Sequence, residues 1–349
     1  MGGASFAVAL PMAGSNYPPK VQGLVLGLAA AGNIGAVLDG FLFPHLADAV
    51  GWKMSTAAAL PLLAITAVAL YAYAWASDAG EKTGSTMRAL SGFAVTLVSL
   101  VVLVLAVNAG VFGGGKAGVR LLPVIGAIVA IAVLPNRYRS VLGERDTWII
   151  MLIYSITFGG FGGMSSYVTL LLTSLYQMPK LEAGLFMSLL AFLGAIVRQF
   201  GGYVADRVTG VRALLVLLAA IAIGDFAFAI WMPPVAGGLA ILVCLYIAFG
   251  LGNGSTFQLV PHRWKGKTGL LSGIVGAAGG IDGVLSAGHH GHREGKHGQL
   301  SDGLCDLRRA LSTGAFGALF LLRGQWLRWS SASAHAHDAV AIGGAHAME

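Results

Sequence analysis

The sequence predicts an all-α fold, a polytopic bundle of transmembrane helices. Of its 349 residues 56% are hydrophobic and 11% are charged, whereas an ordinary soluble domain has about 25% charged residues. Apolar runs long enough to cross about 30 Å of hydrocarbon recur along the chain. The few charges gather mainly in the connections between these runs. Such a chain leaves no room for a soluble domain.

The apolar runs define about ten predicted spans. They are residues 21–44, 56–76, 89–113, 119–135, 147–173, 183–205, 211–231, 236–258 and 268–285, with a shorter run at 310–323. Four connections rich in Lys and Arg then fall on one side of the membrane, which the positive-inside rule makes the cytoplasm. These cations are Lys20; Arg137, Arg139 and Arg145; Arg207 and Arg212; and Arg263, Lys265 and Lys267. The net charge of +7 therefore indicates the lipid bilayer as a partner and no nucleic acid.

Two glycine-rich segments resemble each other. "QGLVLGLAAAGNIGAVL" at 22–38 and "TGLLSGIVGAAGGIDGVL" at 268–285 both carry glycines four residues apart. Small residues at this spacing share one helix face and let two backbones approach closely. The pattern indicates either helix packing alone or a face that leaves room for a small substrate between two halves of a transporter.

Three charged residues stand out within the predicted spans, namely Asp39, Arg198 and Asp225. Charges in a span are costly and are therefore candidates for function. Arg198 lies about two turns from the charged end at 206–207, too deep for its side chain to reach water easily. Because a guanidinium stays charged and donates parallel hydrogen bonds, it suits a planar oxyanion. A structural salt bridge is the alternative for Arg198, and proton coupling is a candidate role for the two aspartates.

Two further groups of residues are candidates. Tyr154 and Phe158 are four residues apart and so share a helix face. The glycines that follow at 159–163 would let this span bend, so the two rings either pack or line a cavity. Asp206 and Arg207 end one helix, and Arg212 lies across a short turn. These three form either a solvated charge cluster or a gating latch between helices.

Four stretches resemble sequence blocks of the nitrate/nitrite porters of the major facilitator superfamily, in the same order. They are "GASFAVALPMAGSNYPPKVQGLVLGLAAAGNIG", "RDTWIIMLIYSITFGGFGG", "VRQFGGYVADRVTGVR" and "GLGNGSTFQLVPHRWKGKTGLLSGIVGAAGG". The resemblance covers most of residues 3–54 and 144–281. The two glycine-rich segments look like the paired nitrate signatures of this family.

The resemblance implies a helical core that binds nitrate or nitrite between its halves, with an arginine from each half on the anion and aromatic rings around it. The matching positions here, which we expect to bind substrate, are Arg198, Tyr154, Phe158, Asn33, Gly276 and Gly279. The implied activity is secondary transport by alternating access, with protons as a candidate coupling ion. We expect a multi-pass protein of the inner (plasma) membrane that is not an enzyme and has no cofactor, catalytic residue or metal ligand.

The sequence departs from the family pattern in several places. Met1 matches the start of the family's fourth helix, so we expect the first three helices, and with them the other arginine, to be missing. The remainder of the N-terminal bundle would span 1–80, and 81–143 would hold an inserted pair of transmembrane helices with a cytoplasmic linker. The C-terminal bundle would span 144–329, followed by a tail at 330–349. Asp39 and Asp282 interrupt the signature helices.

The residues at 283–309 break the apolar pattern most strongly. One hypothesis is that they are translated out of frame, because permitted codons read one base later encode a family-like loop and the start of an apolar helix. The chain would then be a non-functional remnant of such a transporter. The rival hypothesis is a metal-binding loop, since imidazoles suit zinc or copper, formed by His289, His290, His292 and His297. A segment this polar cannot span hydrocarbon, and we expect it to be irregular or exposed.

Overall fold

The computed structural model describes residues 17, 22–29, 34–76, 86–109, 136–231, 233–264 and 267–290. Within these segments the chain is helical and forms no strand, which confirms the predicted all-α class. The chain divides into two compact units. The larger unit comprises residues 1–34 and 134–349, and the smaller unit comprises residues 35–133. The predicted domain boundaries differ from this division and remain predictions.

The smaller unit contains α3 (Ile34–Ala57), α4 (Ala59–Ala76) and α5 (Thr86–Asn108). Helix α3 bends at Gly51, whose φ of 79° is readily adopted only by glycine. Along α4 the exposed side chains are apolar, with Leu62 and Val68 exposed by 69% and 68%. A helix that exposes such side chains is typical of a span in contact with lipid.

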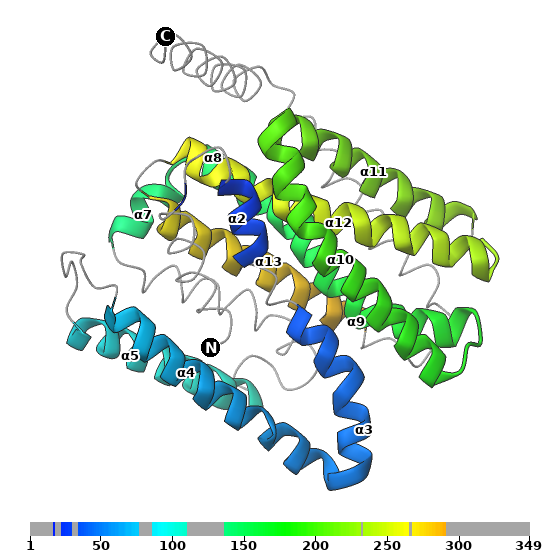
Figure 1. The fold of residues 1–349 in the computed structure, drawn as a ribbon, viewed down its shortest axis with the longest axis horizontal. Helices are drawn as coiled ribbons and strands as arrows, with labels where there is room; N and C mark the ends of the chain where they lie inside the picture. Colours follow the sequence, from blue (N-terminus) through cyan, green and yellow to red (C-terminus); the bar gives the residue numbers. More distant parts are fainter. Residues whose placement is uncertain are drawn as a thin grey trace, which may run out of the picture. The chain divides into compact units, whose positions relative to one another are not determined.

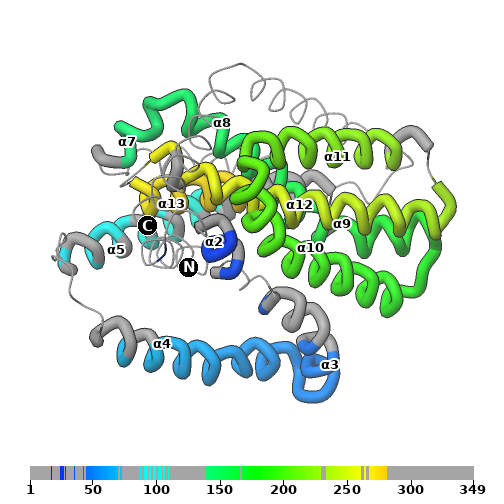
Figure 2. Tube along the Cα trace, turned by 45° about the horizontal axis from the view of Figure 1, so that its top comes forward, coloured from blue at the N-terminus to red at the C-terminus, as the bar shows by residue number. Residues whose placement is uncertain are grey.

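The larger unit is a bundle with α10 near its centre (Figures 1 and 2). Helix α10 packs against α2, α9, α11 and α12, and α13 packs against the segment from α8 through η3 to α9. Short connections at residue 209 and at 232–234 make α10, α11 and α12 neighbours. The elements are α2 (Gln22–Ala29), α7 (Asn136–Leu142), α8 (Arg145–Tyr154), the π-helical turn η3 (Ser155–Gly159), α9 (Gly160–Leu175), α10 (Lys180–Val208), α11 (Gly210–Trp231), α12 (Val235–Arg263) and α13 (Thr268–His290).

Five helical segments of the described residues are long and apolar enough to cross a membrane. Four coincide with predicted spans, and they are Arg145–Ser165, Lys180–Val208, Gly210–Phe228 and Val235–Val260. The fifth, His45–Ala69, joins the end of α3 to α4, whereas the sequence predicts separate spans at 21–44 and 56–76. The alanines at the junction carry no turn signal, and the N–H of Ala58 still donates to the carbonyl of Met54 at 2.9 Å. The predicted spans at 119–135 and 310–323 lie outside the described residues.

The start of the polar segment is helical. Helix α13 continues through Asp282 to His290, so the backbone at 283–290 is not irregular, while the exposure of these side chains, the other half of the expectation, lies outside the described residues. Serine, alanine and histidine in this stretch all tolerate helical backbone, and polarity alone does not end a helix. The rest of the segment, including His292 and His297, lies outside the described residues.

Glycines bring α10 and α12 into backbone contact. A Cβ placed on Gly254 of α12 would overlap the backbone carbonyl of Arg198, and one on Gly201 of α10 would overlap the backbone of Leu251. The hydroxyl of Ser255 donates to the carbonyl of Gly201 at 3.1 Å. These two helices therefore pack as a unit along their facing small residues.

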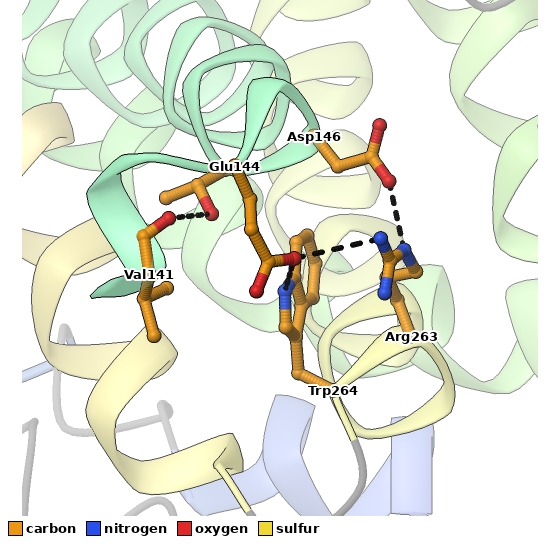
Figure 3. Close-up of polar contacts among 6 residues, drawn as sticks. Val141, Glu144, Asp146, Arg263 and Trp264 are labelled. Atoms are coloured by element: carbon orange, nitrogen blue, oxygen red, sulfur yellow. Dashed lines mark hydrogen bonds and ion pairs between the residues drawn. The ribbon is translucent and has the colours of Figure 1, made fainter. Parts of the chain in front are cut away.

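A polar cluster links the end of α12 to the start of α8 (Figure 3). Arg263 Nε donates to Asp146 at 2.8 Å, and its Nη2 lies 3.4 Å from Glu144. The indole N–H of Trp264, a residue only 3% exposed, donates to Glu144 Oε2 at 2.8 Å. The charged ends of these two helices therefore lie together at one end of the larger unit, as the charge distribution predicts.

Replacing Gly254 by alanine is expected to lower the melting temperature of the chain in detergent. The added Cβ meets backbone atoms of α10, and overpacking of this kind costs about 1–3 kcal/mol, which outweighs the roughly 1 kcal/mol helix preference of alanine over glycine. Gly184→Ala is the matched control, because nothing lies within 4 Å of a Cβ there. Thermal unfolding followed by circular dichroism measures both, and equal melting temperatures would contradict the close contact.

Replacing Glu144 by alanine is expected to destabilise the chain by about 1–3 kcal/mol, because the buried indole N–H of Trp264 loses its acceptor. Asp146→Asn is expected to cost less than about 1 kcal/mol, since the ion pair with Arg263 is partly exposed and screened. Unfolding of both variants in the same detergent compares the two. A larger loss in Asp146→Asn would show that the ion pair, and not the indole hydrogen bond, holds the helix ends together.

Candidate anion-binding site

Arg198 lies at the centre of the candidate site, on α10 inside the larger unit. The residue is 1% exposed, which confirms that its charge lies deep in the bundle. Its Nη2–H donates to the hydroxyl of Tyr154 at 3.2 Å. The predicted arginine and one of the predicted aromatic residues are therefore in direct contact.

Three aromatic rings surround the guanidinium. Tyr154 and Phe158 stack with their centroids 5.2 Å apart and an interplanar angle of 4°. Phe257 of α12 meets Tyr154 edge to face at 5.0 Å. The Arg198 Cζ lies 5.9 Å from the Phe158 centroid and 5.6 Å from the Phe257 centroid. Aromatic faces attract a cation without neutralising it, so the rings hold the guanidinium while it stays charged.

The helix that carries Tyr154 changes its winding at the site. Residues Ser155–Gly159 form a π-helical turn between α8 and α9, within the glycine-rich stretch that the sequence predicts to bend. Such turns insert one extra residue into a helix and are frequent at functional sites. Despite the wider turn, Tyr154 and Phe158 still stack, so both rings reach the same place beside α13.

Gly279 of α13 makes room for these rings. A Cβ on Gly279 would lie 2.7 Å from Tyr154 Cδ1 and 3.0 Å from Phe158 Cδ1. The second glycine-rich signature therefore contacts the site through Gly279. Gly276, one turn earlier on α13, is half-buried. Asn33, the site residue predicted from the first signature, lies outside the described residues.

The sequence did not single out two residues of α12 that belong to this region. Phe257 contacts both Tyr154 and Arg198, and Asn253, one turn before it, is 2% exposed. The available signal was a polar residue inside an apolar run, spaced four from an aromatic residue, in "GNGSTF". That pattern does not predict which helix packs against the face that carries Asn253 and Phe257.

The three residues predicted to gate have different surroundings. Asp206 Oδ2 accepts the backbone N–H of Leu24 at 3.1 Å, near the start of α2, where backbone N–H groups have no helical partner. The Arg207 guanidinium lies 4.5 Å from the Tyr203 ring centroid. Arg212, near the start of α11, is exposed. Asp206 therefore links α10 to α2, a helix that is distant from it in the sequence.

Two predicted intramembrane aspartates and the predicted metal ligands remain. Asp225 is 5% exposed on α11, and the side chain of Asp39 lies outside the described residues. Among the residues that the structure describes, no three His, Cys, Asp or Glu side chains are grouped to hold a metal ion. Most of the histidine-rich segment falls beyond them.

The arrangement around Arg198 has the chemistry of a site for a small monoanion. It offers one permanent positive charge, a fork of N–H donors, a phenolic hydroxyl and three rings that exclude water. A guanidinium fork of this kind is the group that suits a planar oxyanion, because it can donate parallel hydrogen bonds.

Over most of its length the chain is similar to several bacterial proteins. The chain is 27% identical over 289 residues to the nitrite extrusion protein of Bacillus subtilis, covering 82% of this chain and 60% of that protein. It is 28% identical over 284 residues to the probable nitrate/nitrite transporter NarK2 of Mycobacterium tuberculosis, covering 81% and 60%. It is 24% identical over 288 residues to the probable nitrate transporter NarT of Staphylococcus epidermidis, covering 82% and 61%. The chain therefore spans about 60% of the length of these relatives.

These matches are to transport proteins and not to enzymes, and they confirm the resemblance drawn from the sequence. The sequence profile of the Major Facilitator Superfamily matches residues 1–287. Because that match covers most of the chain, the chain belongs to the Major Facilitator Superfamily.

Proposed function

We propose that this protein carries out secondary active transport of nitrate or nitrite across the plasma membrane by alternating access, with protons as the coupling ion. The observation that carries the proposal is the burial of Arg198, 1% exposed, between the Tyr154 hydroxyl and aromatic rings. The names of the relatives support the choice of anion.

The binding step follows from the electrostatics of the site. A buried guanidinium has lost its water shell at a cost of several kcal/mol. A monovalent anion offsets that cost, because it neutralises the positive charge and accepts hydrogen bonds from the guanidinium N–H groups. A water molecule is neutral and cannot compensate the charge. Tyr154 and Phe257 orient the guanidinium, so the fork is set before the anion arrives.

The release step requires the halves of the transporter to rock around the bound anion. We assign Asp206 to the gate, because its carboxylate joins the end of α10 to the first turn of α2. A carboxylate near a helix N-terminus is stabilised by the helix dipole. Breaking this contact would remove the hydrogen bond that joins α10 to α2. Arg207 lies in the last turn of α10, and Arg212 lies near the start of α11.

Arg198→Gln is expected to lower kcat/KM for nitrate uptake into proteoliposomes at least about 30-fold, because loss of a buried charge partner costs about 2–5 kcal/mol. Tyr154→Phe keeps the ring and the charge and removes one neutral hydrogen bond, so a loss of about 5-fold is expected. The graded order of the two variants tests the site. No uptake by the unchanged chain above empty vesicles would instead support an inactive remnant.

Asp206→Asn is expected to change the maximal uptake rate about 2- to 5-fold while the nitrate KM stays the same, because a carboxylate at a helix N-terminus is worth about 0.3–1 kcal/mol and does not contact the anion. Glu182→Gln is the matched control, since Glu182 is an exposed carboxylate in the first turn of the same helix. An altered KM with an unaltered rate in Asp206→Asn would argue against a gating role.

A further inference from the structure

Asn253 carries a buried polar group that the fold does not satisfy. The residue is 2% exposed, and within the described part of the chain its Oδ1 is buried and finds no hydrogen-bond partner. Polar side chains inside a membrane bundle normally pair with a side chain, the backbone or a substrate. By contrast, nearby polar residues of α12 are satisfied: Ser255 donates to Gly201, and Thr256 donates to Gly252.

The contacts of neighbouring residues on α12 place Asn253. Tyr246, Asn253 and Phe257 are spaced by seven and four residues and so lie along one face of the helix. On that face Tyr246 contacts Ser165 of α9 at 3.1 Å and Met187 of α10 at 3.5 Å. Phe257, one turn beyond Asn253, contacts Tyr154 and Arg198. Asn253 therefore lies along the seam between α10 and the segment from α8 to α9, at the level just beside Arg198.

The residues on either side of Asn253 agree with this position. A Cβ on Gly252 would lie 2.6 Å from Thr157 Cγ2 of η3. A Cβ on Gly254 would overlap the backbone carbonyl of Arg198. The backbone at 253 is thus held between the π-helical turn that follows Tyr154 and the turn of α10 that carries Arg198.

We propose that the Asn253 carboxamide is a further ligand of the substrate anion and discriminates nitrate from nitrite. A half-turn of the carboxamide exchanges Oδ1 and Nδ2, so the group can present an N–H donor to an anion oxygen. The Arg198 fork takes two oxygens in parallel. Asn253 then donates to the third oxygen, which nitrate has and nitrite lacks. Being neutral, it adds a donor while the site keeps the single positive charge that a monoanion matches.

This inference rests on the proposed function, and binding to the purified full chain separates the two. Calorimetric titration with sodium nitrate and with sodium nitrite gives a Kd for each anion. Asn253→Leu, which keeps the side-chain size, is expected to raise the nitrate Kd about 10-fold, since a hydrogen bond to a charged group is lost. The nitrite Kd should change by less than about 3-fold. Nitrite has no third oxygen, so it makes no hydrogen bond to Asn253 that the substitution could remove.

A second readout does not depend on the anion. If a ligand and not the protein satisfies the Asn253 carboxamide, Asn253→Leu leaves the ligand-free melting temperature unchanged or raises it. Asn253→Asp is a second isosteric variant that places a carboxylate beside the anion and should weaken both anions more than about 10-fold. Thr256→Val is the matched control, because that buried hydroxyl already donates to its own helix at 2.8 Å, and it should leave both Kd values unchanged.

Each failure has its own signature. If the unchanged chain binds neither anion, the proposed function is overturned and the anion-ligand assignment with it. If the unchanged chain binds nitrate but Asn253→Leu leaves the nitrate Kd within about 2-fold, or weakens both anions equally, only the role of Asn253 is overturned. A lower ligand-free melting temperature in Asn253→Leu would show that the carboxamide supports the fold, which also overturns the inference.

Discussion

The burial of one positive charge constrains the rest of the larger unit. Arg198 lies among aromatic rings in an apolar bundle. Its guanidinium is stable there only if its N–H groups find hydrogen-bond acceptors and its positive charge is compensated. Tyr154 accepts one N–H at 3.2 Å, and the faces of Phe158 and Phe257 add cation–π attraction. None of these groups carries a negative charge. Together these contacts hold the guanidinium in one place inside the bundle.

Placing those rings around the charge requires small residues on two helices, α12 and α13. Gly254 lets α12 approach the backbone of Arg198, and Gly279 leaves space for the ring of Tyr154. The π-helical turn after Tyr154 widens the helix while Tyr154 and Phe158 stay stacked. Glycine at these two positions therefore allows close packing, since a methyl group at either position would push a helix away from the site.

The sequence predicted the parts of this picture that depend on local pattern. Helices α10 and α12 match their predicted apolar runs but extend past them, because charged ends such as Arg207 and Arg263 continue each helix into the polar interface. Helix α11 matches its predicted run to within one residue. Arg198 was predicted from its depth, and Tyr154 and Phe158 from their spacing. Phe257 and Asn253 were not, because only the packing of α12 against α8 and α10 brings them to the arginine. Likewise, no sequence pattern shows that Gly279 meets the Tyr154 ring.

The candidate anion site and the candidate gate lie on one rigid helix. Arg198 and Asp206 are separated by eight residues of α10, about 12 Å along the axis. Asp206 joins α10 to α2, and Arg198 joins the same helix to α8 and α12. A continuous helix transmits a tilt from one end to the other, so a movement that opens the contact with Leu24 also shifts the guanidinium against Tyr154. Anion binding, which fixes the guanidinium, would in turn bias the gate. This coupling needs no other moving part than α10 with α12 packed against it.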